Sequence, residues 1–201
     1  MQGLRDLMEG YERVGLPPRM VFSVLLWIGF FVYWRVAAAN AAPMQKVESP
    51  GSRRVHEVLI GSAQLLLLLS IPGLRLRFVP LTPVLIGVGV AVQLGSLALA
   101  IWARRHLGRY WSAEVATKVD HQLVRSGPYR VIRHPIYTAV LGLCVGTAIV
   151  SGEVHALLGT ALMAVAYWRK IRMEERTMLD AFGDTYEEYR RTSKALVPGV
   201  L

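Results

Sequence analysis

One stretch of the sequence decides the fold: residues 121–176 read HQLVRSGPYRVIRHPIYTAVLGLCVGTAIVSGEVHALLGTALMAVAYWRKIRMEER. It holds two apolar runs, about 135–150 and 154–168, which are separated only by the three residues 151–153. At ~1.5 Å per residue each run forms a helix of roughly 22 Å, which is shorter than the ~30 Å hydrocarbon core of a bilayer. We therefore predict a tight helical hairpin whose helices continue past the lipid at its open end. The second helix should run on toward Leu179.

Three more apolar runs precede this stretch, at about 20–42, 55–71 and 83–103. Hydrophobic residues make up 53% of the 201-residue chain, and the mean hydropathy is +0.37. Because the apolar residues come in blocks instead of being spread periodically, lipid and not a soluble core is the expected surrounding. The sequence predicts an all-α integral membrane protein, a single membrane domain over residues 1–201 with about five transmembrane helices.

Basic residues set the expected orientation. The formal net charge is +9, and the segments 104–133 and 169–194 each hold seven Arg or Lys. The positive-inside rule places both segments in the cytoplasm, together with the loop 46–54, and leaves the N-terminus outside. Arg75 and Arg77, which would lie outside, oppose this orientation. Basic charge between apolar runs indicates orientation and contact with anionic membrane lipids, and no nucleic-acid-binding motif accompanies it.

The N-terminus and the cysteine content exclude two further features. Residues 1–19 carry six charged side chains before any long apolar run, so we expect no cleavable signal and a first span that stays in the membrane. The single cysteine, Cys144, lies inside an apolar run. The sequence therefore predicts no disulfide framework and no metal site.

A first polar cluster, residues 121–137, leads into the predicted hairpin. Gly127-Pro128 predicts a turn, and Pro135 suits the first position of a helix, so His134 would lie at the N-cap. Free N–H groups at that helix start, supported by Arg130 and Arg133, would make an anion site.

A second polar cluster, residues 169–176, follows the hairpin and contains the carboxylate pair Glu174-Glu175. Downstream, Gly183 predicts the end of this helix, and Asp184 with Glu187 predicts a capping box at the start of a last short helix. A hairpin returns the chain to the side of the membrane where it entered. We therefore expect the two clusters to form opposite walls of one cytoplasmic site.

Each feature also has a plainer interpretation. His134 can be only a helix cap, and Tyr129 and Tyr137 can belong to the aromatic belt at the membrane surface. Glu174-Glu175 can be a solvated helix face that pairs with nearby basic residues. The joint order and spacing of the clusters favour a site over these separate roles.

The order and spacing of both clusters resemble one enzyme superfamily. The first reads His121-x-Leu123-Val124-x-x-Gly127-Pro128-Tyr129-Arg130-x-x-Arg133-His134-Pro135-x-Tyr137, and the second reads Glu174-Glu175-x-x-x-Leu179-x-x-x-Gly183-x-x-Tyr186-x-x-Tyr189. With an apolar hairpin between them, they resemble the isoprenylcysteine carboxyl methyltransferase and phospholipid methyltransferase superfamily over about residues 104–198. No glycine-rich Rossmann fingerprint occurs, so the fold would differ from that of the soluble methyltransferases.

The resemblance implies a membrane methyltransferase that takes S-adenosylmethionine from the cytosol and a lipophilic small molecule or lipidated substrate from the bilayer. Residues 1–103 would hold the first three spans on the substrate side. Residues 104–201 would form a catalytic core in which the motif loop, the hairpin and amphipathic C-terminal helices build the cofactor site. The implied cofactor-binding residues are His121, Gln122, Leu123, Val124, Tyr129, His134, Pro135, Ile136, Tyr137 and Glu174. The implied catalytic residues are Arg133, Glu174 and Glu175. For substrate binding, Lys170 matches the position of a basic residue, and Arg169 and Arg172 lie close enough to take that role.

The acceptor of the methyl group stays open between alternatives. The first activity that we predict is carboxyl O-methylation of an isoprenylcysteine-like acid, and N-methylation of a phospholipid amine is the alternative within the superfamily. A sterol-reductase-like oxidoreductase with a nicotinamide cofactor would usually have more than five spans. A non-enzymatic scaffold or transporter subunit is a further class. Transport would need ionisable groups at mid-membrane depth, where Gln93 is the clear polar residue, and a lone Gln there indicates helix–helix contact.

Overall fold

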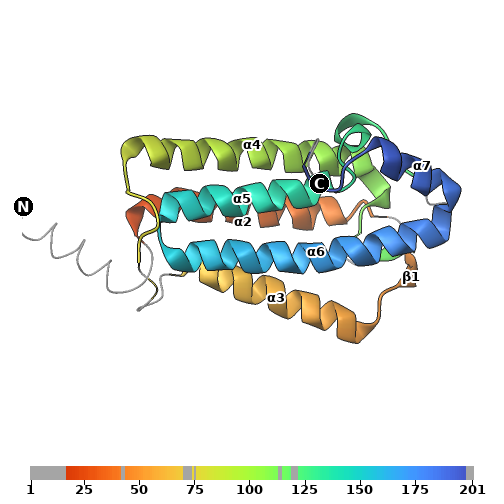
Figure 1. Cartoon of the computed structure of the whole chain (residues 1–201), viewed down its shortest axis with the longest axis horizontal. Helices are drawn as coiled ribbons and strands as arrows, with labels where there is room; N and C mark the ends of the chain where they lie inside the picture. The colour runs from red at the N-terminus through yellow and green to blue at the C-terminus, as the bar shows by residue number, and fades with distance from the viewer. Residues whose placement is uncertain are drawn as a thin grey trace, which may run out of the picture.

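The computed structural model describes residues 17–41, 44–69, 74, 76–112, 115–118 and 122–197, and within them the protein is almost entirely helical (Figure 1). The long helices are α2 (Pro18–Ala38), α3 (Pro50–Leu68), α4 (Pro83–Leu107), α5 (Pro135–Ser151) and α6 (Val154–Phe182), followed by the short α7 (Asp184–Thr192). All five apolar runs are helices, as predicted, and the helix expected to reach Leu179 ends three residues beyond it.

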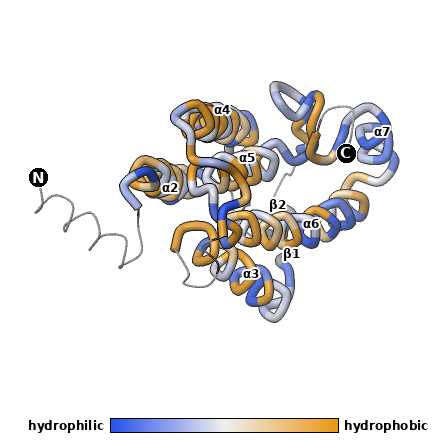
Figure 2. Tube along the Cα trace, turned by 60° about the vertical axis from the view of Figure 1, so that its left-hand side comes forward, coloured by the Kyte–Doolittle hydropathy of each residue, from blue (hydrophilic) through white to orange (hydrophobic). Residues whose placement is uncertain are grey.

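Helix α5 lies at the centre of the bundle, which explains its uniformly apolar sequence. Eleven of its 17 residues are buried. Helix α4 packs along one side of it and α6 along another, α2 also contacts it, and α3 packs mainly on α6 (Figure 2). A helix that is apolar all round must be enclosed by other elements or by lipid, and α5 is enclosed by helices.

Glycines let the central helices approach closely. A Cβ built on Gly146 of α5 would lie 2.6 Å from the carbonyl oxygen of Gly89 in α4, and one on Gly159 of α6 would lie 2.8 Å from the carbonyl oxygen of Ala63 in α3. Small residues at such crossings are typical of helix packing in membranes, where close contact replaces the hydrophobic effect as the driving force. These two crossings fix where α4 and α3 lie relative to the hairpin.

A buried polar network joins α2, α4 and α5. The amide of Gln93 donates to the Thr147 hydroxyl at 2.7 Å and to the Ser23 hydroxyl at 3.0 Å, and Trp27 Nε1 donates to Thr147 at 3.0 Å. The prediction that Gln93 links helices is confirmed.

The hairpin turn has two residues, Gly152 and Glu153, one fewer than predicted, because Ser151 still belongs to α5. It closes the bundle at the end opposite to the motif clusters. Gly152 has φ +70, a left-handed conformation that favours glycine. The following carboxylate, Glu153, is 2.7 Å from Arg19 of α2 and 2.9 Å from His155, whose other ring nitrogen is 2.7 Å from the Leu66 carbonyl of α3. One buried carboxylate therefore ties the turn to two further helices.

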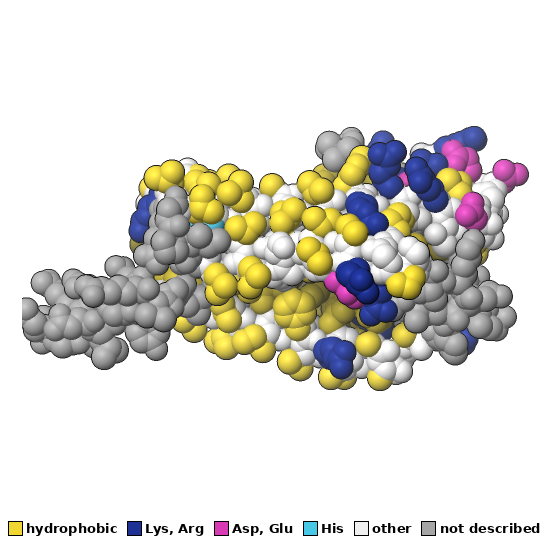
Figure 3. Space-filling model, turned by 90° about the horizontal axis from the view of Figure 1, so that it is seen from below, with side chains coloured by type: hydrophobic (Ala, Val, Ile, Leu, Met, Phe, Trp, Pro, Cys, Tyr) yellow, Lys and Arg dark blue, Asp and Glu magenta, His cyan; other side chains and the backbone are white. Residues whose placement is uncertain are grey.

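Two described helices are long and apolar enough to cross a membrane, at Pro18–Ala38 and Pro83–Tyr110, and the apolar Pro135–Ser151 is shorter. Only 22% and 17% of the most apolar windows of the first two are buried inside the protein, so most of their apolar surface faces outward. Figure 3 shows apolar side chains along the whole bundle, whereas most charged side chains lie toward one end. Outward apolar helix faces and a charged end are typical of a protein embedded in lipid.

Two details differ from the sequence predictions. Helix α7 begins at Asp184 itself, after Gly183 as its N-cap, and no side chain caps it, so the capping box predicted for Asp184 and Glu187 is wrong. A short antiparallel ribbon of β1 (Met44–Val47) and β2 (Ala116–Lys118) was not predicted. It links the α2–α3 loop to the motif loop, and the sequence carries no alternating pattern there.

Candidate active site

The motif loop between α4 and α5 folds over the charged end of the bundle. It contains two 3₁₀ turns, Gly108–Tyr110 and Gly127–Arg130, and the second begins at Gly127 with φ +58. This turn, predicted at Gly127-Pro128, buries Tyr129, which is 6% exposed. The Tyr189 hydroxyl of α7 donates to the Tyr129 carbonyl at 2.5 Å. A contact from the C-terminal helix α7 therefore helps to hold the motif loop in place.

His134 is the N-cap of α5, as predicted, and Pro135 is the first helical residue. The backbone N–H of His134 donates to the Ala195 carbonyl at 3.0 Å, while the N–H groups of Tyr137 and Thr138 donate to the His134 carbonyl. Because proline has no N–H, the hydrogen bonds among the described residues leave only the N–H of Ile136 to serve the anion site predicted at this helix start.

The two predicted walls meet around His134. Its Nδ1 lies 3.4 Å from a Glu174 oxygen, and its Nε2 lies 3.4 Å from a Glu175 oxygen. The Tyr137 hydroxyl donates to Glu174, and Arg133 Nε donates to Glu175 at 2.8 Å. Residues some 40 positions apart are thus brought into contact by the hairpin, and this part of the prediction is confirmed.

Burial and pairing compete in this cluster, and pairing prevails. Burial alone would lower the pKa of His134, but its contacts with Glu174 and Glu175 raise it. Burial would raise the pKa of Glu175, yet hydrogen bonds from His134 and Arg133 hold it at about 2. The pKa of Glu174 is also lowered, against burial, by His134 and Lys170. The pairing therefore favours an imidazolium between two ionised carboxylates.

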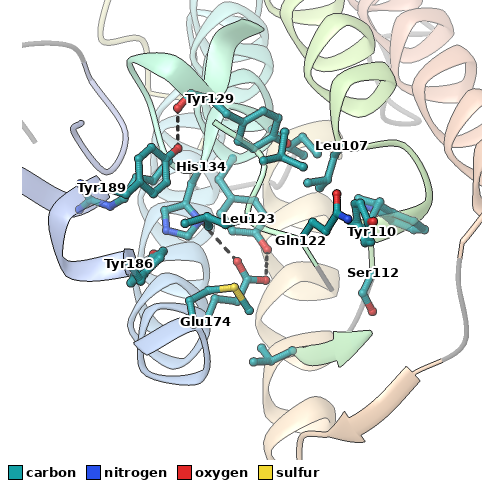
Figure 4. A pocket seen from close by; sticks show the side chains of 17 residues that line it. Leu107, Tyr110, Ser112, Gln122, Leu123, Tyr129, His134, Glu174, Tyr186 and Tyr189 are labelled. Atoms are coloured by element: carbon teal, nitrogen blue, oxygen red, sulfur yellow. Dashed lines mark hydrogen bonds and ion pairs between the residues drawn. The ribbon is translucent and has the colours of Figure 1, made fainter. Parts of the chain in front are cut away.

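A cavity of about 140 Å³ opens beside this cluster (Figure 4). In Figure 4, Glu174 and His134 form one side, Tyr186 and Tyr189 of α7 flank them, and the end of α4 with the motif loop lies opposite. The lining residues are Leu107, Tyr110, Trp111, Ser112, Val115, Gln122, Leu123, Val124, Tyr129, Arg133, His134, Ile136, Tyr137, Glu174, Met178, Tyr186 and Tyr189. Aromatic and aliphatic walls with few converging polar groups are typical of a small-molecule site.

Most residues predicted to bind the cofactor line this cavity. Those that do are Gln122, Leu123, Val124, Tyr129, His134, Ile136, Tyr137 and Glu174. Pro135 is buried and begins α5 without lining the cavity, and His121 lies outside the described residues. Of the predicted catalytic residues, Arg133 lines the cavity, and Glu175 lies behind it and pairs with Arg133 and Arg190.

The three basic residues predicted for substrate binding lie in three different surroundings. The ammonium of Lys170 lies 5.7 Å from the centre of the Tyr137 ring, and its side chain is buried. Arg169 instead donates to the Ser52 hydroxyl of α3 at 2.8 Å, and Arg172 is exposed. Only Lys170 therefore lies against a residue of the cavity wall.

Several lining residues were missed by the sequence reasoning. Tyr186 and Tyr189 stand in the second motif, but no role was assigned to them. The others come from the end of α4 and the residues after it, where Trp111 packs against the buried guanidinium of Arg104, 4.6 Å from its ring centre. Arg104 also donates to the Ala37 carbonyl of α2 at 2.5 Å. A buried arginine at the end of an apolar run was the one signal that could have pointed to this wall.

Comparison with known proteins agrees with the predicted resemblance. Residues 88–180 match the isoprenylcysteine carboxyl methyltransferase (ICMT) family. The protein-S-isoprenylcysteine O-methyltransferase of Schizosaccharomyces pombe is 32% identical over 115 residues, which are 52% of this chain and 48% of that protein. Methanethiol S-methyltransferase 1 of Bradyrhizobium diazoefficiens is 31% identical over 71 residues, 35% of this chain and 24% of that one. The chain thus aligns with about half the length of the first relative, or less for the second.

The fold agrees as well. A solved structure of the eukaryotic intramembrane Ras methyltransferase ICMT superposes with a TM-score of 0.58 and 20% sequence identity, covering 92% of this chain and 68% of that one. The predicted resemblance to the isoprenylcysteine methyltransferase superfamily is therefore confirmed by the family and sequence matches, and the helical fold is similar to that of the solved structure.

Proposed function

We propose, on the premise that residues 88–180 match the ICMT family, that this chain is an S-adenosylmethionine-dependent membrane methyltransferase acting on a lipophilic acid of the isoprenylcysteine type. One observation supports this most directly. The two motifs converge on one cavity, where His134 links the carboxylates Glu174 and Glu175 while mainly aromatic and aliphatic side chains cover the remaining walls.

The cavity lining suits the proposed cofactor. Apolar and aromatic surfaces such as Leu123 and Tyr129 fit an adenine ring, and the Glu174 carboxylate accepts hydrogen bonds from an amino group or ribose hydroxyls. We assign cofactor binding to the lining residues predicted for it, together with Pro135, and to His121. When bound, the cofactor supplies a methyl group on sulfur that passes to the acceptor oxygen as the carbon–sulfur bond breaks, with the electron pair remaining on sulfur.

The residues around the cavity need to align the reactants more than to move protons. An acceptor carboxylate is already a nucleophile, so no general base is required. Glu174 and Glu175 hold His134 in place between them, and Arg133 holds Glu175. We therefore assign Arg133, Glu174 and Glu175 to ordering the site, and Lys170 to the acceptor.

We further propose that all five long helices cross the membrane, with the motif end of the bundle in the cytoplasm. The single domain would divide into a substrate side, 1–103, and a catalytic core, 104–201. The basic segments support this orientation through the positive-inside rule. A lipophilic or lipidated substrate would then reach the cavity from the bilayer, while the cofactor enters from the cytosol.

Equilibrium binding of S-adenosylmethionine to the purified full-length protein in detergent tests the proposal. We expect saturable binding, and weakening of at least ~10-fold for Glu174→Gln and His134→Ala, because each removes a charge-assisted contact. Glu57→Gln is the matched control. Glu57 is an exposed carboxylate of α3, and its ion pair among the described residues is with Arg53.

The result that would overturn the proposal is a folded protein with no measurable binding at millimolar cofactor. Binding of NADPH instead would favour the oxidoreductase alternative. If S-adenosylmethionine binds, methyl transfer from labelled cofactor to lipophilic acids, amines and thiols identifies the acceptor class. Wild-type binding and turnover in both site variants would remove the site assignment.

A further inference from the structure

Helix α3 contributes a buried histidine, included in neither motif, that packs on Tyr167 behind the cavity wall. His56 is 8% exposed, and its Nδ1 has no hydrogen-bond partner among the residues that the structure describes. Buried polar atoms are almost always paired, because an unpaired one loses its hydration without compensation. An orphaned ring nitrogen is therefore a feature that a bound molecule can explain.

A column of rings connects His56 to the cavity. His56 meets Tyr167 of α6 edge to face at 5.9 Å, and Tyr167 stacks on Tyr137 of α5 at 4.6 Å. Tyr137 lines the cavity and stacks on His134 at 5.5 Å with the ring planes 8° apart. The α3 histidine is thus part of one packed unit with the cavity wall.

Lys170 lies close enough for its charge to act on both His56 and Glu174. It is 6% exposed, lies one helical turn before Glu174 on α6, and places its ammonium 5.7 Å from the Tyr137 ring centre. The charges that act on His56 are those of Lys170, Glu48, Glu174 and Arg169. A buried ammonium attracts an anion and repels a second cation, so this place favours an acidic group over an amine.

We propose that His56 and Lys170 together bind the acid group of the methyl acceptor, with His56 as the residue of the first half of the chain that selects an anionic acceptor. This inference rests on the proposed methyltransferase function and deepens it. The imidazole N–H donates to one acceptor oxygen while the ammonium of Lys170 balances the charge. An amine acceptor of the same length meets the ammonium of Lys170 and is disfavoured.

The test compares acceptors in the full-length protein, reconstituted in phosphatidylcholine vesicles with labelled S-adenosylmethionine. The probes are an N-acylated S-prenylcysteine and the matched compound with an amine in place of the carboxyl group. His56→Phe keeps the ring and its contact with Tyr167 but removes both nitrogens. We expect the KM for the acid to rise at least ~10-fold while cofactor affinity changes less than ~2-fold, because a hydrogen bond to a charged group is lost only on the acceptor side.

Three further variants separate binding from structure. His56→Asn, whose amide can replace a ring N–H, should restore the KM to within ~3-fold of wild type. Lys170→Gln should raise the same KM and should also narrow the preference for acid over amine. Gln64→Leu is the matched control, since Gln64 also has a buried polar atom without a described partner but lies two turns further along α3. It should leave the KM unchanged.

The possible failures are distinguishable. A wild-type KM for the acid in His56→Phe overturns the inference, as does a wild-type enzyme that binds the cofactor and prefers the amine. If His56→Phe does not fold, unchanged KM values in both His56→Asn and Lys170→Gln overturn it. A protein that binds no S-adenosylmethionine overturns the proposed function itself.

Discussion

At the scale of single residues, His134 shows how a polar group can be buried at the end of an apolar helical bundle. Its side chain is 8% exposed, and each ring nitrogen faces a different carboxylate at 3.4 Å. Since both partners are acceptors, the imidazolium form satisfies both, and the two glutamates stay ionised in return. Removing one member leaves a buried charge without its partner, which costs more than the pair contributes.

The acid stability of the protein should report on Glu175. Its pKa is about 2 in the folded protein, against an ordinary value of 4.5, so the unfolded chain binds the proton more tightly. The stability that comes from its contacts is therefore present above about pH 4.5 and is lost as the pH falls toward about 2. His134, whose pKa is raised, stays protonated over this range.

We expect Glu175→Gln to lower the stability at pH 6 by about 2 kcal/mol, or roughly 5 °C in Tm, and to make the loss below pH 4.5 shallower than in wild type. Thermal unfolding in detergent from pH 2.5 to 6 measures both. Glu57→Gln should follow the wild-type curve. Parallel curves for wild type and Glu175→Gln would show that Glu175 contributes nothing to acid sensitivity.

At the scale of elements, the C-terminal segment holds the motif loop in place. Arg133 connects the two segments, because its guanidinium donates to Glu175 of α6 and to the Ser193 carbonyl of the tail, the latter at 2.6 Å. The backbone of residues 131–134 pairs with Lys194 and Ala195, and Thr138 donates to the Leu196 carbonyl at 2.7 Å. The loop that lines the cavity is thus held between α6 and the tail after α7.

Arg133→Lys should weaken the contact between the motif loop and the tail, because a single ammonium cannot replace a planar guanidinium that bonds a carboxylate and a carbonyl at the same time. We expect the amides of His134 and Lys194 to exchange with solvent at least ~10-fold faster, while those of central α5 do not change. Hydrogen exchange read by mass spectrometry checks this. Arg130→Lys is the control in the same loop, since Arg130 is exposed. Equal exchange in both variants would contradict the role of Arg133.

The crossing of α4 and α5 depends on the absence of one side chain. A Cβ at Gly146 would meet two backbone atoms of α4, at 2.6 Å and 3.0 Å, and backbone cannot rotate away. We expect Gly146→Ala to lower the Tm in detergent by ~5–10 °C, which corresponds to about 2–3 kcal/mol of overpacking. Gly87→Ala on α4, where the added carbon meets nothing within 4 Å, should leave the Tm unchanged or slightly higher. A stable Gly146→Ala variant would show that the two helices can separate without cost.

At the scale of the whole molecule, what the sequence predicts and what it misses have different physical origins. The helices and the meeting of His134 with Glu174 follow from apolar run lengths and a short turn, which are local properties. The approach of His56 from α3 depends on the crossing at Gly159, and the hold on Arg133 depends on carbonyl groups of the tail. Backbone acceptors leave no residue pattern, and a glycine that permits a close crossing does not say which helix it meets. These parts of the site were therefore not predictable.

Topology is the property of the whole molecule that labelling can test. Cys144 is buried, and Cys144→Ala provides a background without thiols. In it, Arg130→Cys places one thiol on the exposed motif loop, and Phe78→Cys places one on the exposed loop at the opposite end, next to the hairpin turn. If five helices cross the membrane, a charged maleimide should modify the cysteine at position 78 in intact cells.

The cysteine at position 130 should react only after the membrane is permeabilised, because the basic segments around it belong to the cytoplasmic side. Cys144→Ala alone gives the background. Reaction of both thiols from one side would contradict a bundle that spans the bilayer, since its two ends would then share a compartment. Reaction of position 130 alone in intact cells would keep the spans but reverse the orientation. A cofactor drawn from the cytosol could then not reach the cavity, so the labelling result bears on the proposed chemistry as directly as on the topology.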